Sequence, residues 1–233
     1  MKKFFNTYLG FTILLAFISC SSNSTESEES TDYMSLAVGD IREYFDTGIE
    51  EYQTWEIKGK IKRSDGLDVF VGEWSSSIDT FTWSSYYAIS DNYFISTELE
   101  KTNNSENPYH EQRLAKINPK DGDRWVHTLG VADSEKVYFS AKYIGNHSTL
   151  AEEFKDVFVF TLSDVLTIYY AKYYGNVGNS SPLDNTFTIS LNYAKISGKE
   201  IGNYVSFNQQ KQLSKKKANY YRRKVNFLGQ FID

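Results

Sequence analysis

The sequence predicts an all-β fold, an antiparallel and strongly curved sheet in the form of an open barrel or a sandwich, with very little helix. Apolar and polar residues alternate with period two at 55–61 and 186–193, which is typical of strands with one buried face. Segments 69–71 and 157–160 are continuous runs of strand-forming residues. Turn-forming residues separate these runs at short intervals, as in an antiparallel sheet.

Three sequence matches suggest that the fold contains two similar β units. A Gly-Asp pair, an Asp-Val-Phe-Val run and a Tyr-Tyr-Ala run each occur twice, in the same order, at offsets of 83, 88 and 83 residues. The matches start at Gly39 and Gly122, at Asp68 and Asp156, and at Tyr86 and Tyr169. We expect one β domain at 33–233, with units at 33–105 and 106–178 and closing strands at 180–233. A repetitive β-strand composition could also produce such matches by itself.

The N-terminus has the composition of an export signal. Two lysines follow Met1, and an apolar stretch at 8–18 comes next. This stretch is about half of the roughly 20 residues that a membrane-spanning helix needs, so residues 1–19 are predicted to be a signal peptide. The single cysteine of the chain, Cys20, follows directly, and its being alone excludes disulfide bonds within the chain.

Residues 17–20, Phe-Ile-Ser-Cys, resemble the lipobox of bacterial lipoproteins, with Phe17 in place of the usual leucine. The resemblance implies that Cys20 receives a lipid and becomes the new N-terminus. The alternative is an unmodified cysteine beside an ordinary secretion cleavage site. Because 21–32 has no apolar side chain, 20–32 is expected to be the lipidated cysteine and a flexible polar tether. We therefore expect a protein of the cell envelope, anchored to the membrane through fatty acids such as palmitate. Ser21 favours the outer membrane, in its periplasmic or its surface-facing leaflet.

The charge of the chain is unevenly distributed. Residues 20–210 carry 16 basic and 29 acidic side chains, whereas 211–224 is basic and contains no acid. The acidic body argues against nucleic acid as a partner. The basic side chains that could contact an anionic envelope partner are Lys215, Lys216, Lys217, Arg222 and Arg223. The alternative is a solvated segment, or one that complements the acidic body.

Three segments, 33–44, 154–159 and 169–178, resemble a loose group of uncharacterised Bacteroidetes-type envelope lipoproteins. The opening of that group reads aromatic-Pro-Leu-x-x-Gly-x-x-Trp-x-Tyr, and this chain has Ser35 for the proline and Arg42 for the tryptophan. The other two segments are similar to its Phe-x-Asp-Val and Tyr-Tyr-Ala-x-x-x-Gly-x-Val motifs. The resemblance implies an antiparallel, strongly curved sheet and no activity.

The sequence contains no catalytic, cofactor-binding or metal-binding motif, so we expect a protein that is not an enzyme and has no cofactor. His110-Glu111 begins like a zinc-protease helix, but Leu114 stands where the second histidine is needed. A hydrolase with scattered residues would require His110, His127 and either Glu111 or Glu152 to converge on one site.

Aromatic residues interleaved with serines provide the remaining candidate site. The aromatic side chains that could contact a ligand are Trp74, Trp83, Tyr86, Tyr87 and Tyr93. The alternative is that they form the core, because aromatic side chains dominate core burial. The leading hypothesis is an envelope lipoprotein that binds an apolar or glycan ligand or a protein partner without catalysis. A structural or assembly-associated lipoprotein that contacts an anionic partner through 211–224 is the alternative, and a hydrolase is the third.

Overall fold

The computed structural model describes residues 32–77, 82–163, 165–181, 184–206 and 209. Within the unit Thr31–Asp233 they form a single antiparallel sheet of 13 strands. The strands are β1 (Ile41–Asp46), β2 (Glu51–Lys62), β3 (Asp68–Ser76), β4 (Thr82–Ser90), β5 (Tyr93–Ser96), β6 (Gln112–Lys116), β7 (Arg124–Val126), β8 (Tyr138–Ser148), β9 (Glu153–Leu162), β10 (Leu166–Ala171), β11 (Gly175–Ser181), β12 (Asp184–Ile196) and β13 (Lys199–Gly202). One 3₁₀ turn, η1 (Asp133–Glu135), is a helical element of the described chain. The predicted all-β, antiparallel fold with very little helix is confirmed.

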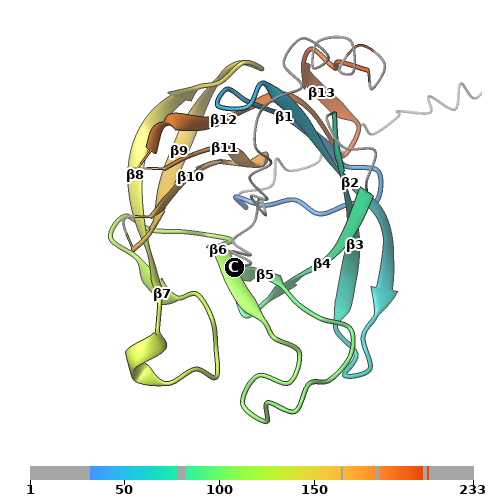
Figure 1. Ribbon diagram of the computed structural model, residues 1–233, viewed down its shortest axis with the longest axis vertical. Helices are drawn as coiled ribbons and strands as arrows, with labels where there is room; N and C mark the ends of the chain where they lie inside the picture. Colours follow the sequence, from blue (N-terminus) through green and yellow to red (C-terminus); the bar gives the residue numbers. More distant parts are fainter. Residues whose placement is uncertain (1–31, 78–81, 164, 182–183, 207–208, 210–233) are drawn as a thin grey trace, which may run out of the picture. The chain divides into compact units, whose positions relative to one another are not determined.

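The sheet curves until its two ends nearly meet, so that it is barrel-shaped (Figure 1). The strand order is β6-β5-β4-β3-β2-β1-β12-β11-β10-β9-β8-β7, and β13 pairs with β12 beside this path. A bridge between Gln112 and Thr128 joins the two ends, and the backbone N–H of Arg113 donates to the carbonyl of His127 at 2.7 Å. The open-barrel form of the prediction therefore applies, rather than the sandwich.

This strand order consists of two six-stranded halves, β1–β6 and β7–β12, that repeat one arrangement. Each half begins with a turn in which a glycine has positive φ, +92° at Gly39 and +82° at Gly122. In each turn the carboxylate of the following aspartate accepts the backbone N–H three residues earlier, at 3.0 Å for Asp40 and 2.8 Å for Asp123. The glycine N–H then donates to the second strand of the half, at 2.8 and 2.9 Å.

The other two sequence matches also take equivalent places. Phe70 of β3 pairs with Tyr87 of β4, and Phe158 of β9 pairs with Tyr170 of β10. On this topology the halves span 41–116 and 124–196, so each begins and ends later than the expected units 33–105 and 106–178, and β12, expected among the closing strands, belongs to the second half. An origin by duplication stays a prediction.

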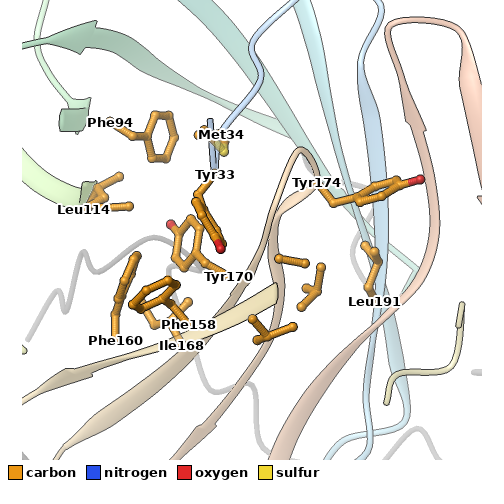
Figure 2. Close-up of a cluster of buried hydrophobic side chains, with 14 of the residues drawn as sticks. Tyr33, Met34, Phe94, Leu114, Phe158, Phe160, Ile168, Tyr170, Tyr174 and Leu191 are labelled. Carbon is orange, nitrogen blue, oxygen red and sulfur yellow. The ribbon is translucent and has the colours of Figure 1, made fainter. Parts of the chain in front are cut away.

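The interior of the sheet is filled by apolar side chains and by the segment that precedes β1 (Figures 1 and 2). The ring of Tyr33 meets the ring of Phe158 edge-on at 5.3 Å, and the backbone N–H of Tyr33 donates to Ile117. The Met34 side chain lies against Gly175, where an added Cβ would clash with its sulfur. A chain segment thus crosses the interior and completes the core.

A second, smaller cluster, Val69, Ala88 and Ile95, lies on alternate positions of β3–β5 and therefore on the other face of the sheet, where Leu99 packs on it.

Among the described residues, no helix has the length and hydropathy required to span a membrane.

Candidate functional site

Polar side chains occupy positions of β1 and β2 that face the interior of the sheet. Alternate residues of a strand share a face, and residues opposite each other on neighbouring strands do too. Arg42 is opposite Trp55, which belongs to the core, and the next pairs on this face are Tyr44 with Gln53 and Asp46 with Glu51. We name the buried polar side chains of this face the interior polar array. Its members are Arg42, Tyr44, Asp46, Glu51, Gln53, Ser76, Tyr170, Asn176 and Asn179.

Arg42 is the cation of the array and is completely buried. Its Nε donates to the carbonyl of Tyr174 at 2.9 Å, Nη2 donates to the carbonyl of Ser35 at 3.3 Å, and the guanidinium lies 4.9 Å from the centre of the Trp55 ring. Burial lowers the pKa of Arg42 because the interior disfavours its charged form. A guanidinium nevertheless stays protonated in proteins.

No carboxylate within the described ranges forms an ion pair with Arg42. Asp40 is the carboxylate whose charge acts on it, but that side chain is bound elsewhere, because its two oxygens accept the backbone N–H groups of Ala37 and Ser197 at 3.0 and 2.8 Å. Arg42 is therefore a buried charge held by carbonyl oxygens and an aromatic ring. Such a charge costs several kcal/mol, as an order of magnitude, unless it is compensated.

Two tyrosines and an asparagine lie near Arg42. The hydroxyl of Tyr44 donates to the backbone carbonyl of Asn176 at 3.0 Å. Tyr170 is opposite Asn176 in the β10–β11 pair, and its ring lies among the core rings in Figure 2. The Oδ1 atom of Asn176 accepts the N–H of Gly178 at 2.9 Å, which fixes the amide so that Nδ2 is its remaining donor. Burial raises the pKa of Tyr170 well above the ordinary range, so its hydroxyl is protonated and can donate.

Acidic and amide groups form the end of the array next to the β1–β2 turn. The carboxylate of Glu51 accepts from the Ser76 hydroxyl, and its other oxygen lies 3.5 Å from Nε2 of Gln53. Asp46 closes the turn, because its Oδ1 accepts the N–H groups of Gly48 and Ile49 at 2.7 and 3.3 Å. These carboxylates therefore have local structural partners.

Six buried side-chain atoms within the described residues have no hydrogen-bond partner. They are Arg42 Nη1, Gln53 Oε1, Trp55 Nε1, Tyr170 Oη, Asn176 Nδ2 and Asn179 Oδ1. All six belong to side chains of the core-facing positions, and four of the six can donate a hydrogen bond. Folded proteins pair more than about 90% of their buried polar groups, so these atoms identify a place where a polar occupant would supply the missing partners.

The aromatic residues predicted as ligand contacts lie in different surroundings. Trp74 and Tyr87 are buried in the core, and the indole N–H of Trp74 donates to the Tyr87 hydroxyl at 3.2 Å. Trp83 is partly buried and stacks on Trp74 at 6.1 Å between ring centres. Tyr86 packs on the second cluster, and Tyr93 lies 4.4 Å from the guanidinium of Arg113. Trp74, Trp83 and Tyr87 therefore lie together beside the array, and their contact with a ligand stays a prediction.

The residues named for a hydrolase have separate partners. His127 is buried edge-on against Phe139, with Nδ1 3.3 Å from the carbonyl of Arg113. Glu111 forms an ion pair with Arg63 at 2.6 Å, whereas His110 and Glu152 are exposed. Within the described ranges, no three His, Cys, Asp or Glu side chains are grouped so that they could hold a metal ion. The hydrolase hypothesis gains no geometric support from these positions and stays untested.

Several predicted residues lie outside the described part of the chain. These are Cys20 with the signal peptide 1–19, most of the tether, and the basic residues Lys215, Lys216, Lys217, Arg222 and Arg223.

Sequence reasoning missed the interior polar array. In the sequence Arg42 is only a departure from the tryptophan of the family motif, and no pattern assigns a role to Gln53 or to Tyr170. The internal repeat contains one indication of the array. Arg42 and Trp125 occupy equivalent places, two residues after the aspartates of the matching Gly-Asp pairs. A polar residue at a position that is apolar in the second copy marks a candidate site.

No model of a known protein family matches the chain, and a search of curated proteins finds no match either. A comparison with solved structures finds a proposed lipoprotein from Parabacteroides distasonis ATCC 8503, known from a crystal structure at 2.70 Å resolution. The match has a TM-score of 0.39 and 7% sequence identity, and it covers 74% of this chain and 100% of that one.

Proposed function

We propose that the protein is a lipid-anchored bacterial envelope protein whose β domain binds a small polar ligand, without catalysis, inside its sheet. The anchor is proposed from the lipobox-like segment 17–20 and the polar segment that follows it. The ligand is proposed from the unpartnered atoms of the interior polar array and Trp55. This form of the hypothesis narrows the ligand from apolar molecule, glycan or protein to a small polar molecule.

The unpartnered atoms carry the argument through their energetic cost. A buried polar group without a partner costs about 1–3 kcal/mol. Six such groups would together cost on the order of 10 kcal/mol, which is similar to the entire stability of an ordinary domain, about 5–15 kcal/mol. Because a folded domain cannot carry that cost uncompensated, a polar occupant inside the sheet is expected to satisfy a large share of these groups.

A polar occupant fits the interior better than an apolar one. Aromatic rings and the side chains of Tyr33 and Met34 already occupy the apolar part of the interior (Figure 2). An apolar ligand would have to displace these groups and would leave the unpartnered atoms unsatisfied. A small polar ligand would instead supply hydrogen-bond partners for the unpartnered atoms.

Ligand binding is tested by thermal unfolding of the full-length protein in detergent, followed through tryptophan fluorescence. The panel contains monosaccharides, amino acids, urea and short organic acids, with fatty acids as the apolar comparison. We expect at least one polar compound to raise the melting temperature, because a ligand that binds only the folded state stabilises it. Gln53→Met, which keeps the size of the side chain but removes its unpartnered oxygen, should reduce the shift caused by a compound that donates hydrogen bonds.

Gln112→Met on β6 is the matched control, because the Gln112 side chain lies outside the array and contacts Ser96. It should leave the shift unchanged. A panel in which only fatty acids raise the melting temperature would overturn the polar-ligand proposal.

The anchor is tested separately by labelling cells with radioactive palmitate. Wild-type protein should take up label and fractionate with membranes, and Cys20→Ala should lose the label. Equal labelling of the two proteins would contradict the proposed anchor.

A further inference from the structure

The two halves of the sheet place different side chains at one equivalent position. Arg42 is the second residue after Asp40, and Trp125 is the second residue after Asp123, in turns that make the same hydrogen bonds. Each faces an aromatic residue on the next strand, since Arg42 pairs with Trp55 and Trp125 pairs with Phe139. The two side chains therefore occupy the same place in the fold.

The second half shows that this place does not need a cation. The indole N–H of Trp125 donates to a backbone carbonyl at 3.2 Å, and its ring stacks on Phe139 at 5.4 Å. Ring packing and one hydrogen bond are thus sufficient to hold the side chain at this position of the second half. In the first half the Nε and Nη2 atoms of Arg42 also donate to backbone carbonyls, those of Tyr174 and Ser35, whereas Nη1 has no partner. A buried charge that the fold does not require indicates a role in binding.

A second difference between the halves lies next to the first. Tyr87 and Tyr170 are equivalent in the two Tyr-Tyr-Ala matches. The hydroxyl of Tyr87 accepts the indole N–H of Trp74, whereas the hydroxyl of Tyr170 has no partner in the described chain. Leu162 stands in the second half where Trp74 stands in the first, six residues after the Asp of the matching run, so it offers no hydrogen bond. The second half therefore lacks a partner for the hydroxyl of Tyr170, which lies close enough to Arg42 to be affected by its charge.

These groups lie within a short span of the chain. Arg42 contacts the carbonyl of residue 174 and Tyr44 contacts that of residue 176, which are two positions apart in the chain. Tyr170 is directly opposite residue 176. The unpartnered Nη1 of Arg42, hydroxyl of Tyr170 and Nδ2 of Asn176 are all donors, and one of them belongs to a charged group.

We infer that Arg42, Tyr170 and Asn176 form a binding site for a small monovalent anion, a halide or the carboxylate of a molecule of formate or acetate size. The inference rests on the proposed function and names its ligand class. The occupant must accept hydrogen bonds, because the free atoms near Arg42 donate them. One negative charge compensates the one guanidinium, and charge-assisted hydrogen bonds are about twice as strong as neutral ones. The surrounding packed rings and the Tyr33–Met34 segment restrict the occupant to a small one.

The test is thermal unfolding of the full-length protein in sodium salts of constant ionic strength. Sodium gluconate, whose anion is too large for the packed interior, gives the baseline, and chloride, bromide or formate replaces it stepwise. At ten times the dissociation constant we expect the melting temperature of the wild type to rise by about 3–6 °C. Arg42→Trp copies the second half of the sheet and should abolish the rise.

Tyr170→Phe removes one donor, keeps the ring, and should reduce the rise to less than half. It decides the question even where Arg42→Trp does not fold. The matched control is Tyr138→Phe, since Tyr138 lies on β8 beneath the guanidinium of Arg124, and this variant should respond as the wild type does.

Three outcomes would overturn the inference. A rise that persists in Tyr170→Phe and in folded Arg42→Trp would place the anion elsewhere. No rise with any anion, together with a rise for a neutral polar compound, would reject the anion and leave the proposed function standing. No rise with either kind of compound would reject both.

Discussion

Gly72 of β3 lies flat against the indole of Trp55 on β2. A Cβ atom added at Gly72 would clash with Trp55 Nε1 and would lie 2.8 Å from Cε2 of Tyr87. Trp55, Trp74 and Tyr87 are among the largest fully buried side chains of the described chain, and the missing side chain of Gly72 provides the space for their rings. The absence of a side chain at Gly72 therefore allows the rings of Trp55 and Tyr87 to pack closely inside the sheet.

Gly72→Ala should destabilise the domain. Neither clashing ring can move easily, because both are enclosed by other aromatic side chains, and overpacking of a core costs about 1–3 kcal/mol. Chemical unfolding followed by tryptophan fluorescence measures the loss. Gly59→Ala on β2 is the control, because nothing lies within 4 Å of its added Cβ, and it should change stability by less than about 1 kcal/mol. Equal stability of Gly72→Ala and wild type would contradict the close contact of Gly72 with the rings of Trp55 and Tyr87.

Tyr87→Phe and Tyr170→Phe should have different effects although the two residues are equivalent in the repeat. Tyr87→Phe leaves the indole N–H of Trp74 buried without its acceptor, at a cost of about 1–3 kcal/mol. Tyr170→Phe removes a hydroxyl that has no partner among the described residues, so in gluconate buffer it should be neutral or stabilising. Urea unfolding in gluconate compares the two, and the reverse order of stability would contradict the assigned hydrogen bonds.

Arg63 should be important for stability at the end of the β2–β3 hairpin. Its buried guanidinium binds the carboxylates of Asp65 and Glu111 at 2.7 and 2.6 Å, binds the hydroxyl of Thr97, and lies 3.7 Å from the ring centre of Tyr109. Arg63→Met removes all of these contacts and should cost about 2–4 kcal/mol in urea unfolding, because Glu111 then loses its charge partner.

Lys60→Met is the comparison for Arg63→Met. The Lys60–Asp68 ion pair is nearly half exposed on both sides, so its loss should cost less than about 1 kcal/mol. Similar losses in the two variants would show that Arg63 does not hold the hairpin to the segment that contains Glu111.

The same guanidinium predicts a pH dependence of stability. Its hydrogen bonds lower the pKa of Asp65 from 3.8 to about 2. Because the folded-state pKa is below the ordinary value, the carboxylate stabilises the fold at pH above 3.8, and this contribution is lost as the pH falls toward 2. Thermal unfolding between these pH values should show a smaller pH slope for Asp65→Asn and for Arg63→Met than for the wild type. An unchanged slope in both variants would contradict the assignment.

The all-β fold could be predicted from the sequence because strand formation depends on local patterns. The alternation at 55–61 and 186–193 falls within β2 and β12, and the apolar runs at 69–71 and 157–160 fall within β3 and β9. The three repeated motifs also occupy equivalent registers, so the two-unit arrangement was visible as far as the Gly-Asp, Asp-Val-Phe-Val and Tyr-Tyr-Ala matches reach. The ends of the halves were not visible, because β6 and β12 share no such motif.

The interior polar array could not be predicted in the same way, because contacts between residues distant in the chain create it. Arg42 stands between Ile41 and Glu43, where alternation alone would allow a solvent-facing cation. Its position inside is set by a hydrogen bond to the carbonyl of Tyr174, 132 positions later. Trp74 and Tyr87 are visible in the sequence, but their role is not. Large aromatic side chains serve both for ligand contact and for core packing, so the sequence does not distinguish the two.

The most direct measurement of the central claim is anomalous diffraction from crystals of the protein grown in sodium bromide. We predict an anomalous peak inside the sheet, within hydrogen-bond distance of Arg42 Nη1 and of the Tyr170 hydroxyl, that is missing in crystals of Tyr170→Phe or much weaker there. Ordered water without anomalous signal at this position, in crystals with bromide bound elsewhere, would contradict the claim that the buried guanidinium serves to bind an anion.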